Sequence, residues 1–452
     1  MKIKTNCVDL LSSPIVWFGG CVFFRLSLDL SYVVFVSTDL WGDGFPYSMD
    51  WFRLAESWVL LGCLIAISPH KFEKASDFLT LLLFVLCIIP ITSYYCWAGG
   101  ARIWFWALGF QFLLFCSALA MMRSYWHKKI WRPHRGPLYA YVLILVILGL
   151  CLFRILQAGV LDQLAFSLEP ELIYSRRAFV SSQVEVGVWG YLVSWATKVC
   201  VIYLLIDAVV RRKWLRMLLA GAGCLMLFGL FAHKAFLFGV IIAGLLLLSW
   251  PIIAKGFSVV PIGLGLLMLA MFASVSILDT YLFQSIFTRR LFFVPAHLDF
   301  VYYEFFSNHS PLMFSNGFLR HFFEYPFDKP YPNVIGDFTG IGGKDTAANN
   351  GFLATGYMQL GWLGVILYPF AAAILVGLVN LFGRRSPGFV AAVCFYPFAA
   401  LFTSSDLPTA ILTHGIGLLL LLLWLDCSNS VREHGGEPHF PALHNQGVKQ
   451  KI

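Results

Sequence analysis

Two long polar segments each carry a pair of adjacent arginines. The segments are residues 155–187 and 280–350, and the pairs are Arg176 with Arg177 and Arg289 with Arg290. A guanidinium group offers a planar fork of N–H donors that matches phosphate oxygens, so paired arginines next to apolar stretches suit the diphosphate headgroup of a lipid. The residue types therefore predict a diphosphate clamp. Surface ion pairs with neighbouring glutamates are the simpler alternative for the first pair.

Further ionisable residues interrupt the apolar stretches, namely Arg25, Arg154, Lys198, His233 and Lys234. Such groups are costly in hydrocarbon, and by default they face a bundle interior or a water-filled cavity. They are therefore candidates for a buried anion site. For Arg154 and Lys234, which lie near the ends of apolar stretches, snorkelling to the membrane interface explains the position equally well.

Aromatic residues follow the second arginine pair, where Tyr302, Tyr303, Phe305 and Phe306 surround Glu304. This pattern predicts a helix in the headgroup plane with its aromatic side chains toward lipid, where it could roof a pocket. Simple anchoring at the interface is the alternative reading.

The rest of the second segment contains Arg320 and His321, then the string GIGGKDT at 340–346 and the pair Asn349 and Asn350. The glycine-rich string lacks the spacing of a nucleotide-binding loop, so a flexible loop is expected there. The two asparagines are expected to open a helix.

The elements that position these residues are membrane spans. The chain has 452 residues, of which 59% are hydrophobic and only 12% charged, far from the balance of a soluble domain. Windows of about 20 apolar residues are long enough to cross a bilayer as helices. We predict an all-α polytopic membrane protein with about twelve spans, at residues 9–27, 54–69, 77–97, 102–122, 137–156, 188–210, 214–232, 235–253, 257–279, 351–380, 387–404 and 407–425.

Lysines and arginines concentrate in alternate connections, which predicts that both termini, including the tail 427–452, are cytoplasmic. The segments 155–187 and 280–350 then face outward as two large loops of one membrane domain spanning residues 1–452. The first apolar stretch carries Arg25 and no cleavage site, so we expect it to be retained. The 11 cysteines avoid both loops, and no cysteine and histidine spacing suggests a disulfide scaffold or a zinc site.

Four strings in this order resemble the Wzy-type O-antigen polymerases, which join oligosaccharide repeat units in bacteria. They are IYSRR, AHK, RRLFFVPAHLDFVYYEFFSNHSP and ANNGFLATGYMQLGWLG. The similarity extends over about residues 140–425 and rests largely on topology. It implies a GT-C-type glycosyltransferase of the Gram-negative inner membrane with its active site on the periplasmic side.

The resemblance also implies the substrates and partners. Such an enzyme transfers a growing glycan from undecaprenyl diphosphate to the non-reducing end of a new undecaprenyl-diphosphate-linked repeat unit. Membrane lipids surround it, and a chain-length regulator and a flippase are possible partners, whereas nucleic acid is not. No cofactor is expected, and the lack of a DxD motif in either outward loop favours metal-independent transfer.

The implied chemistry assigns roles to the candidates. Negative charge develops on the diphosphate leaving group, which favours preorganised cations, here any of the four paired arginines. A base for the acceptor hydroxyl is expected if configuration inverts. The candidates for that base are His297, Asp299, Glu304, His309 and His321, with Asp345 behind them. The remaining substrate-binding candidates are Tyr174, Lys198, His233, Lys234, Tyr303, Arg320, Asn349 and Asn350.

Three alternatives remain open from the sequence. An O-antigen ligase would share the donor but pass the glycan to lipid A core. A flippase or other transporter would need no base, and its basic side chains should line the spans rather than gather in outward loops. A passive scaffold of a polysaccharide assembly complex would need neither charged loop.

Overall fold

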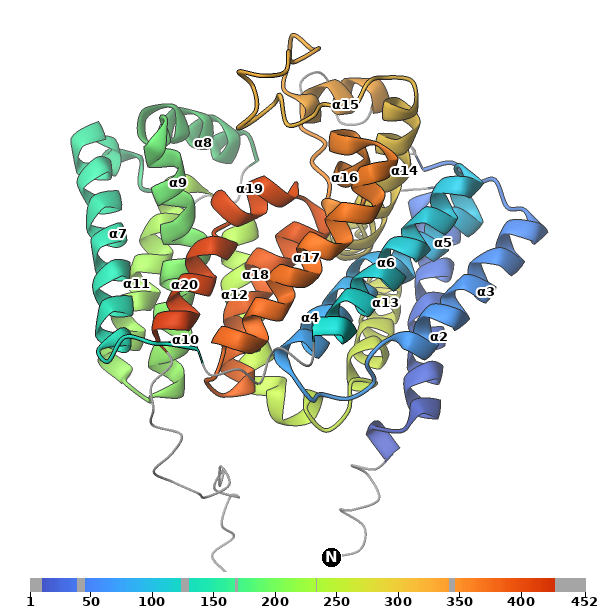
Figure 1. Cartoon of the computed structure of the whole chain (residues 1–452), viewed down its shortest axis with the longest axis horizontal. Helices are drawn as coiled ribbons and strands as arrows, with labels where there is room; N and C mark the ends of the chain where they lie inside the picture. Colours follow the sequence, from blue (N-terminus) through green and yellow to red (C-terminus); the bar gives the residue numbers. More distant parts are fainter. Residues whose placement is uncertain are drawn as a thin grey trace, which may run out of the picture.

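The computed structural model describes residues 10–38, 45–122, 130–166, 170–232, 234–340 and 346–426, without the side chains of 170–174, 234 and 235. Within these ranges every regular element is a helix (Figure 1). The predicted α-helical class is therefore confirmed. His233, Asp345 and the tail 427–452 lie outside the described residues.

Nine helical stretches in the described part of the chain are long and apolar enough to cross a membrane. Three of these stretches join an α-helix to a π-helical segment. Pro14–Val36 consists of α2 (Pro14–Ser31) and η1 (Tyr32–Val36), and Ala75–Ala98 consists of α4 (Ala75–Leu83), η2 (Phe84–Ile88) and α5 (Ile89–Ala98). Val188–Val210 consists of α9 (Val188–Trp195), η5 (Ala196–Cys200) and α10 (Val201–Val210), whereas Phe236–Ile253 is the greater part of α12 (Lys234–Ile253). The others are α6 (Arg102–Met122), α7 (Gly136–Ala158), α11 (Trp214–Phe231), α13 (Val259–Leu278) and α17 (Trp362–Phe382).

The other predicted spans differ from the helices observed. Helices α3 (Trp51–Ile67) and α18 (Pro387–Thr403) each have 17 residues. The apolar run 351–380 divides at Gly361 into α16 (Phe352–Leu360) and α17, and the run 407–425 divides at Gly415 into α19 (Leu407–Leu412) and α20 (Ile416–Leu425). Both glycines have positive φ, 58° and 78°, a conformation that few other residues adopt without strain. A hydropathy profile reports side-chain composition, so it does not detect these changes in backbone conformation.

The two predicted loops are themselves largely helical. The first contains the 3₁₀ turn η4 (Val160–Gln163) and α8 (Pro170–Val184), and the second contains the π-helical η6 (Gln284–Phe293), α14 (Val294–Ser307) and α15 (Tyr331–Thr339). Helices α8 and α15 lie at the top of Figure 1, whereas α2 begins and α20 ends at the bottom. The two loops therefore share one side of the bundle.

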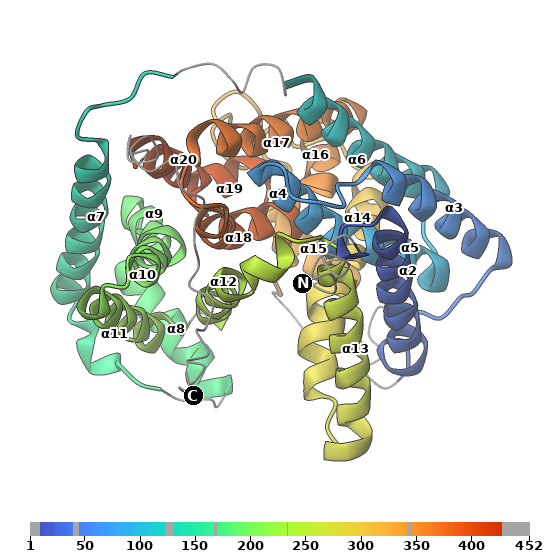
Figure 2. The ribbon, with the colours of Figure 1, turned by 90° about the horizontal axis from the view of Figure 1, so that it is seen from below.

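The helices form two groups with a central row between them. Figure 2 shows α7, α9, α10 and α11 at one end of the molecule and α2, α3, α5 and α6 at the other, with α12, α17, α18 and α20 between. Helix α2 packs along α13, α6 along α17, and α12 along α18. The central row thus joins the end that carries α8 to the end that carries α14.

Helix α14 is buried, so the prediction that its aromatic residues face lipid is wrong. Tyr302 is fully buried, and Phe305 and Phe306 are 7% and 4% exposed. The Tyr302 hydroxyl donates a hydrogen bond to the carbonyl oxygen of Ala348 at 2.7 Å. Helix α14 packs against α16 and α5, which cover the face that sequence reasoning assigned to lipid.

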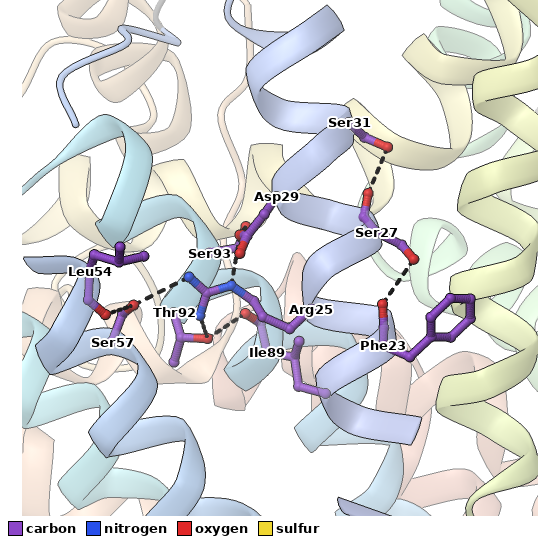
Figure 3. A network of polar contacts seen from close by, with 10 residues as sticks. All are labelled: Phe23, Arg25, Ser27, Asp29, Ser31, Leu54, Ser57, Ile89, Thr92 and Ser93. Atoms are coloured by element: carbon purple, nitrogen blue, oxygen red, sulfur yellow. Dashed lines mark hydrogen bonds and ion pairs between the residues drawn. The ribbon is translucent and has the colours of Figure 1, made fainter. Parts of the chain in front are cut away.

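The buried arginine of the first span forms an ion pair with a residue of its own helix (Figure 3). Arg25 is fully buried, and its Nε donates to Asp29 at 2.7 Å. Its other nitrogens donate to Thr92 of α5 at 2.8 Å and Ser57 of α3 at 3.3 Å. A paired and hydrogen-bonded charge of this kind joins three helices. Arg25 is therefore structural, and the hypothesis of an anion site there is not supported.

Candidate functional site

A polar cavity of about 620 Å³ is lined in part by residues of α8 and α15, the helices at the top of Figure 1. Its wall combines segments that are far apart in the sequence: α8, the helical stretch from α9 to η5, η6, the start of α15, and the connection between α18 and α20. The lining residues are Arg177, Glu185, Ser194, Thr197, Lys198, Ala232, Phe236, Arg290, Tyr331, Asn349, Tyr396, Ser404, Ser405, Asp406, Thr409 and His414. Both predicted loops therefore contribute to one cavity.

Three cationic side chains line this cavity. Arg177 comes from the first loop, Arg290 from the second, and Lys198 from the span between them. Arg177 and Arg290 are exposed, and neither has a hydrogen-bond or ion-pair partner among the described residues. Lys198 makes one hydrogen bond within that part of the chain, to the Ser194 Oγ at 3.4 Å, and the carboxylate of Glu185 lines the same cavity. Two guanidinium groups and one ammonium group are therefore available to an anionic ligand.

Two of these cations stand on π-helical segments. Lys198 lies in η5 and Arg290 in η6. A π-helical turn holds one extra residue compared with an α-helical turn, which changes the direction of the side chains around it, and such turns are frequent at functional sites. Asn349 reaches the same cavity from the segment that precedes α16.

A further part of the wall comes from the connection between α18 and α20, which sequence reasoning did not select. Ser404, Ser405 and Asp406 precede α19, and His414 follows it. These residues sit in a short polar interruption of two apolar runs, which the hydropathy pattern marks only as a turn between spans. The occurrence of Ser-Ser-Asp and a histidine within eleven residues, between two apolar runs, is the sequence feature that could have identified these residues.

Asp406 is the buried carboxylate of this wall, with 2% of its surface exposed. It accepts hydrogen bonds from Gln359 Nε2 at 2.9 Å and from the Tyr368 hydroxyl at 3.0 Å. Burial raises the pKa of the Asp406 carboxyl, while these hydrogen bonds act in the opposite direction. The result is a carboxylate with fixed geometry and increased basicity.

His414 offers a second acceptor in the same cavity. Its Nδ1 is buried and has no hydrogen-bond partner in the described part of the protein. Burial, followed by the positive charge of Lys198, lowers the pKa of His414 to about 3. The imidazole is therefore neutral at physiological pH.

The structure separates each pair of adjacent arginines. Arg176 is absent from the described lining of the cavity, and its Nε is buried. Arg289 is 6% exposed, and its guanidinium carbon lies 5.3 Å from the centroid of the Phe45 ring. The four predicted clamp residues thus divide into two that reach the cavity, Arg177 and Arg290, and two that point elsewhere.

Two predicted bases are buried in α14 instead of lining the cavity. His297 Nδ1 pairs with the Tyr94 hydroxyl at 2.7 Å, and burial together with Arg289 lowers the pKa of His297 to about 4. Asp299 is 4% exposed and accepts a hydrogen bond from Asn350 Nδ2 at 2.8 Å. Because Asn350 is adjacent to Asn349, this pair fixes the segment that supplies Asn349 to the cavity.

We expect Asp299 to make the protein less stable as the pH rises. Burial raises the pKa of its carboxyl to about 8, so the folded state holds a proton that the unfolded state loses near pH 4. The contribution of Asp299 to the free energy of unfolding is therefore fully present below about pH 4 and is lost as the pH rises to about 8. The variant Asp299→Asn should reduce the fall in melting temperature between pH 5 and pH 8. An equal fall in both proteins would contradict this account.

Glu304 and His309 are exposed residues at the end of α14. The His309 ring stacks on Phe305 with centroids 4.0 Å apart, and Tyr303 stacks on Trp104 at 4.8 Å. Tyr303, Glu304 and His309 are all absent from the described lining of the cavity. Arg320 and His321 instead line a second cavity. The side chains of Tyr174 and Lys234 and the whole of His233 lie outside the described part of the structure.

Arg154 has a structural environment. Its Nη1 donates to Gln157 Oε1 at 3.1 Å and its Nη2 to the Gln183 carbonyl oxygen at 2.5 Å, and the Trp189 ring lies 5.7 Å from its guanidinium carbon. These contacts join the end of α7 to the end of α8 and the start of α9. The side chain therefore fixes the first loop on the bundle.

The helices and the cavity define the class of protein. The chain is a polytopic α-helical membrane protein with a cationic cavity on one side. Comparisons with protein-family models, with curated proteins and with solved structures find no match. In the described ranges no group of three or more histidine, cysteine, aspartate or glutamate side chains is arranged to hold a metal ion.

Proposed function

We propose that this protein is an O-antigen polymerase of the bacterial inner membrane. It transfers a growing glycan from undecaprenyl diphosphate to the non-reducing end of a new lipid-linked repeat unit at the periplasmic face. The observation that carries the proposal is the convergence of Arg177, Arg290 and Lys198 from three separate elements on one cavity. A lipid diphosphate carries the anionic oxygens that such a cluster recognises.

The reaction places defined demands on the cavity. The acceptor hydroxyl oxygen attacks the anomeric carbon of the donor, and a new glycosidic C–O bond forms as the C–O bond to the diphosphate breaks. Undecaprenyl diphosphate leaves with the bonding electron pair, so charge grows on its oxygens. Arg177, Arg290 and Lys198 stabilise that charge, and contacts of this kind lower the barrier when they strengthen in the transition state.

The proton of the acceptor hydroxyl needs a base in the same cavity. Asp406 is our choice, because its carboxylate is fixed by two side-chain hydrogen bonds and lines the same cavity as the three cations. His414 is the second candidate, since the buried Nδ1 of its neutral imidazole has no hydrogen-bond partner among the described residues. His297 and Asp299, which are buried in α14, are assigned to structure.

The alternatives fit this arrangement less well. A transporter would place its cations along a path through the spans, whereas two of the three cations come from loop segments on one side. A passive scaffold has no need of a cavity that gathers three cations and a buried carboxylate. A ligase shares the donor chemistry and differs in its acceptor, so it is separated from a polymerase by its product.

A gel of lipopolysaccharide from a deletion strain tests the proposal. For a polymerase we expect the long ladder to vanish and a band of core plus one repeat unit to remain, because export and ligation continue. Complementation with the intact gene should restore the ladder. Loss of every band that contains a repeat unit would instead indicate a ligase or a flippase.

A further inference from the structure

A second cavity of about 590 Å³ adjoins the cationic one. It lies between the segment 314–321, which follows α14, and helix α19. The two cavities share Asp406 and Thr409 in their walls. A ligand in the second cavity would therefore meet a ligand in the first at the Asp406 carboxylate.

One wall of the second cavity is aromatic. Phe314 and Phe318 lie with ring centroids 5.0 Å apart, and Phe318 is 61% exposed. The backbone that presents them is strained, because Met313 and Phe314 have φ values of 49° and 60°. Strain of this kind persists where the surrounding structure imposes it, often at ligand sites. Tyr191 of α9 also lines this cavity.

The floor of the second cavity is a side-chain amide network. Gln359 is fully buried, and its Oε1 accepts the backbone N–H of Phe314 at 2.9 Å. Its Nε2 donates to Asn316 Oδ1 at 3.0 Å and to Asp406 Oδ2 at 2.9 Å. The Asn316 side chain is exposed, and in the described part of the chain its amide N–H groups have no acceptor. Donors of fixed orientation therefore stand beside the aromatic wall.

We propose that this second cavity binds sugar rings of the lipid-linked glycan. A sugar ring has an apolar C–H face that packs on an aromatic ring and a hydroxyl edge that needs planar hydrogen-bonding groups, and Phe314, Phe318 and Asn316 supply both. Arg320 and His321 are exposed side chains that add further donors. This inference rests on the proposed polymerase function and adds to it a subsite separate from the diphosphate clamp.

The test uses the full-length protein in nanodiscs and a soluble probe. The probe is the repeat-unit oligosaccharide released by mild acid from its lipid diphosphate, and binding is followed by saturation-transfer NMR. We expect Phe318→Ala to weaken binding about tenfold through loss of the stacking surface. Phe322→Ala is the matched control, because Phe322 directly follows this segment and is 79% exposed, but it is absent from the lining of the cavity. It should bind like the wild type.

Other variants separate this inference from the proposed function. The probe lacks a diphosphate, so Arg290→Ala should bind it normally even where that variant makes no polymer. Equal affinity of wild type and Phe318→Ala, or no binding by the wild type, would overturn the sugar subsite and leave the clamp to be judged by the gel. Normal glycan binding with an unaltered ladder in both Arg177→Ala and Arg290→Ala would overturn the clamp alone.

The same probe, reduced to its alditol, distinguishes the two ends of the glycan. Reduction changes only the sugar that adjoined the diphosphate. Undiminished binding of the alditol would support recognition of the acceptor's non-reducing end. Loss of binding would instead place the sugar that adjoined the diphosphate in the cavity.

Discussion

Replacing Arg177 or Arg290 with alanine is expected to abolish the long lipopolysaccharide ladder in a complemented deletion strain. Each change removes one donor from the developing charge on the diphosphate, which typically costs about 10²–10³ in rate. Both side chains line the cavity and are exposed, so the fold should tolerate their removal. Gels of lipopolysaccharide report the product, and immunoblots of membrane fractions confirm equal protein levels.

Arg176→Ala is the matched control for Arg177→Ala. The two residues are adjacent on α8, carry the same charge and differ in that only Arg177 lines the cavity. The control should retain the ladder. A normal ladder from both Arg177→Ala and Arg290→Ala, with the protein present in the membrane, would rule out the clamp.

Replacing Asp406 with asparagine is expected to lower the polymerisation rate by about 10²–10⁴, the usual contribution of a general base. Asparagine keeps the shape of the side chain, and its oxygen can keep the hydrogen bonds from the Tyr368 hydroxyl and the Leu407 N–H, while its amide group faces Gln359 Nε2, which loses its acceptor there. Immunoblots of membrane fractions should confirm that the variant is present at the wild-type level. His414→Gln is the companion variant and should lose far less activity if Asp406 is the base.

The pH profile of the wild type separates these two groups further. A base must be unprotonated, and the pKa of Asp406 is raised, so activity should fall as the pH drops through that raised value. His414, with a pKa of about 3, would leave activity level until far more acidic conditions. A large loss in His414→Gln together with an active Asp406→Asn would reverse the assignment.

Much of the fold could be predicted from the sequence because the hydrophobic effect marks membrane spans strongly. In the part of the chain that the structure describes, nine helical stretches qualify as membrane spans by length and composition, and the loops share one side of the bundle. The breaks at Gly361 and Gly415 escaped prediction because the apolar runs continue across them. A positive φ is a property of the backbone that composition does not report.

The candidate site was predicted in part. Charge and position identified Arg177, Arg290, Lys198 and Asn349, and all four line one cavity. Sequence could not decide which arginine of each pair faces inward, because adjacent residues on a helix point in directions about 100° apart and the helix rotation is set by packing. Nor could it reveal the role of α14, whose aromatic residues are equally compatible with a lipid interface and a protein core.

Asp406 and His414 were missed for a different reason. Each stands in a connection only a few residues long between apolar helices, where sequence analysis expects a turn with no further role. Their importance comes from tertiary contacts with α16, α17 and η5 that join residues far apart in the chain.

The π-helical segments have a genetic consequence. Because η5 holds one residue more per turn than an α-helix, a deletion of a single codon there would restore a regular helix. The remaining span would stay apolar and long enough to insert, and the side chains beyond the deletion would keep nearly the same direction, because the wider turn had absorbed the extra residue. The wall of the cavity would therefore change only around Lys198, while the rest of the span kept its contacts. In an evolving lineage, the cation of this span can be moved or lost through a change of three nucleotides without rebuilding the bundle.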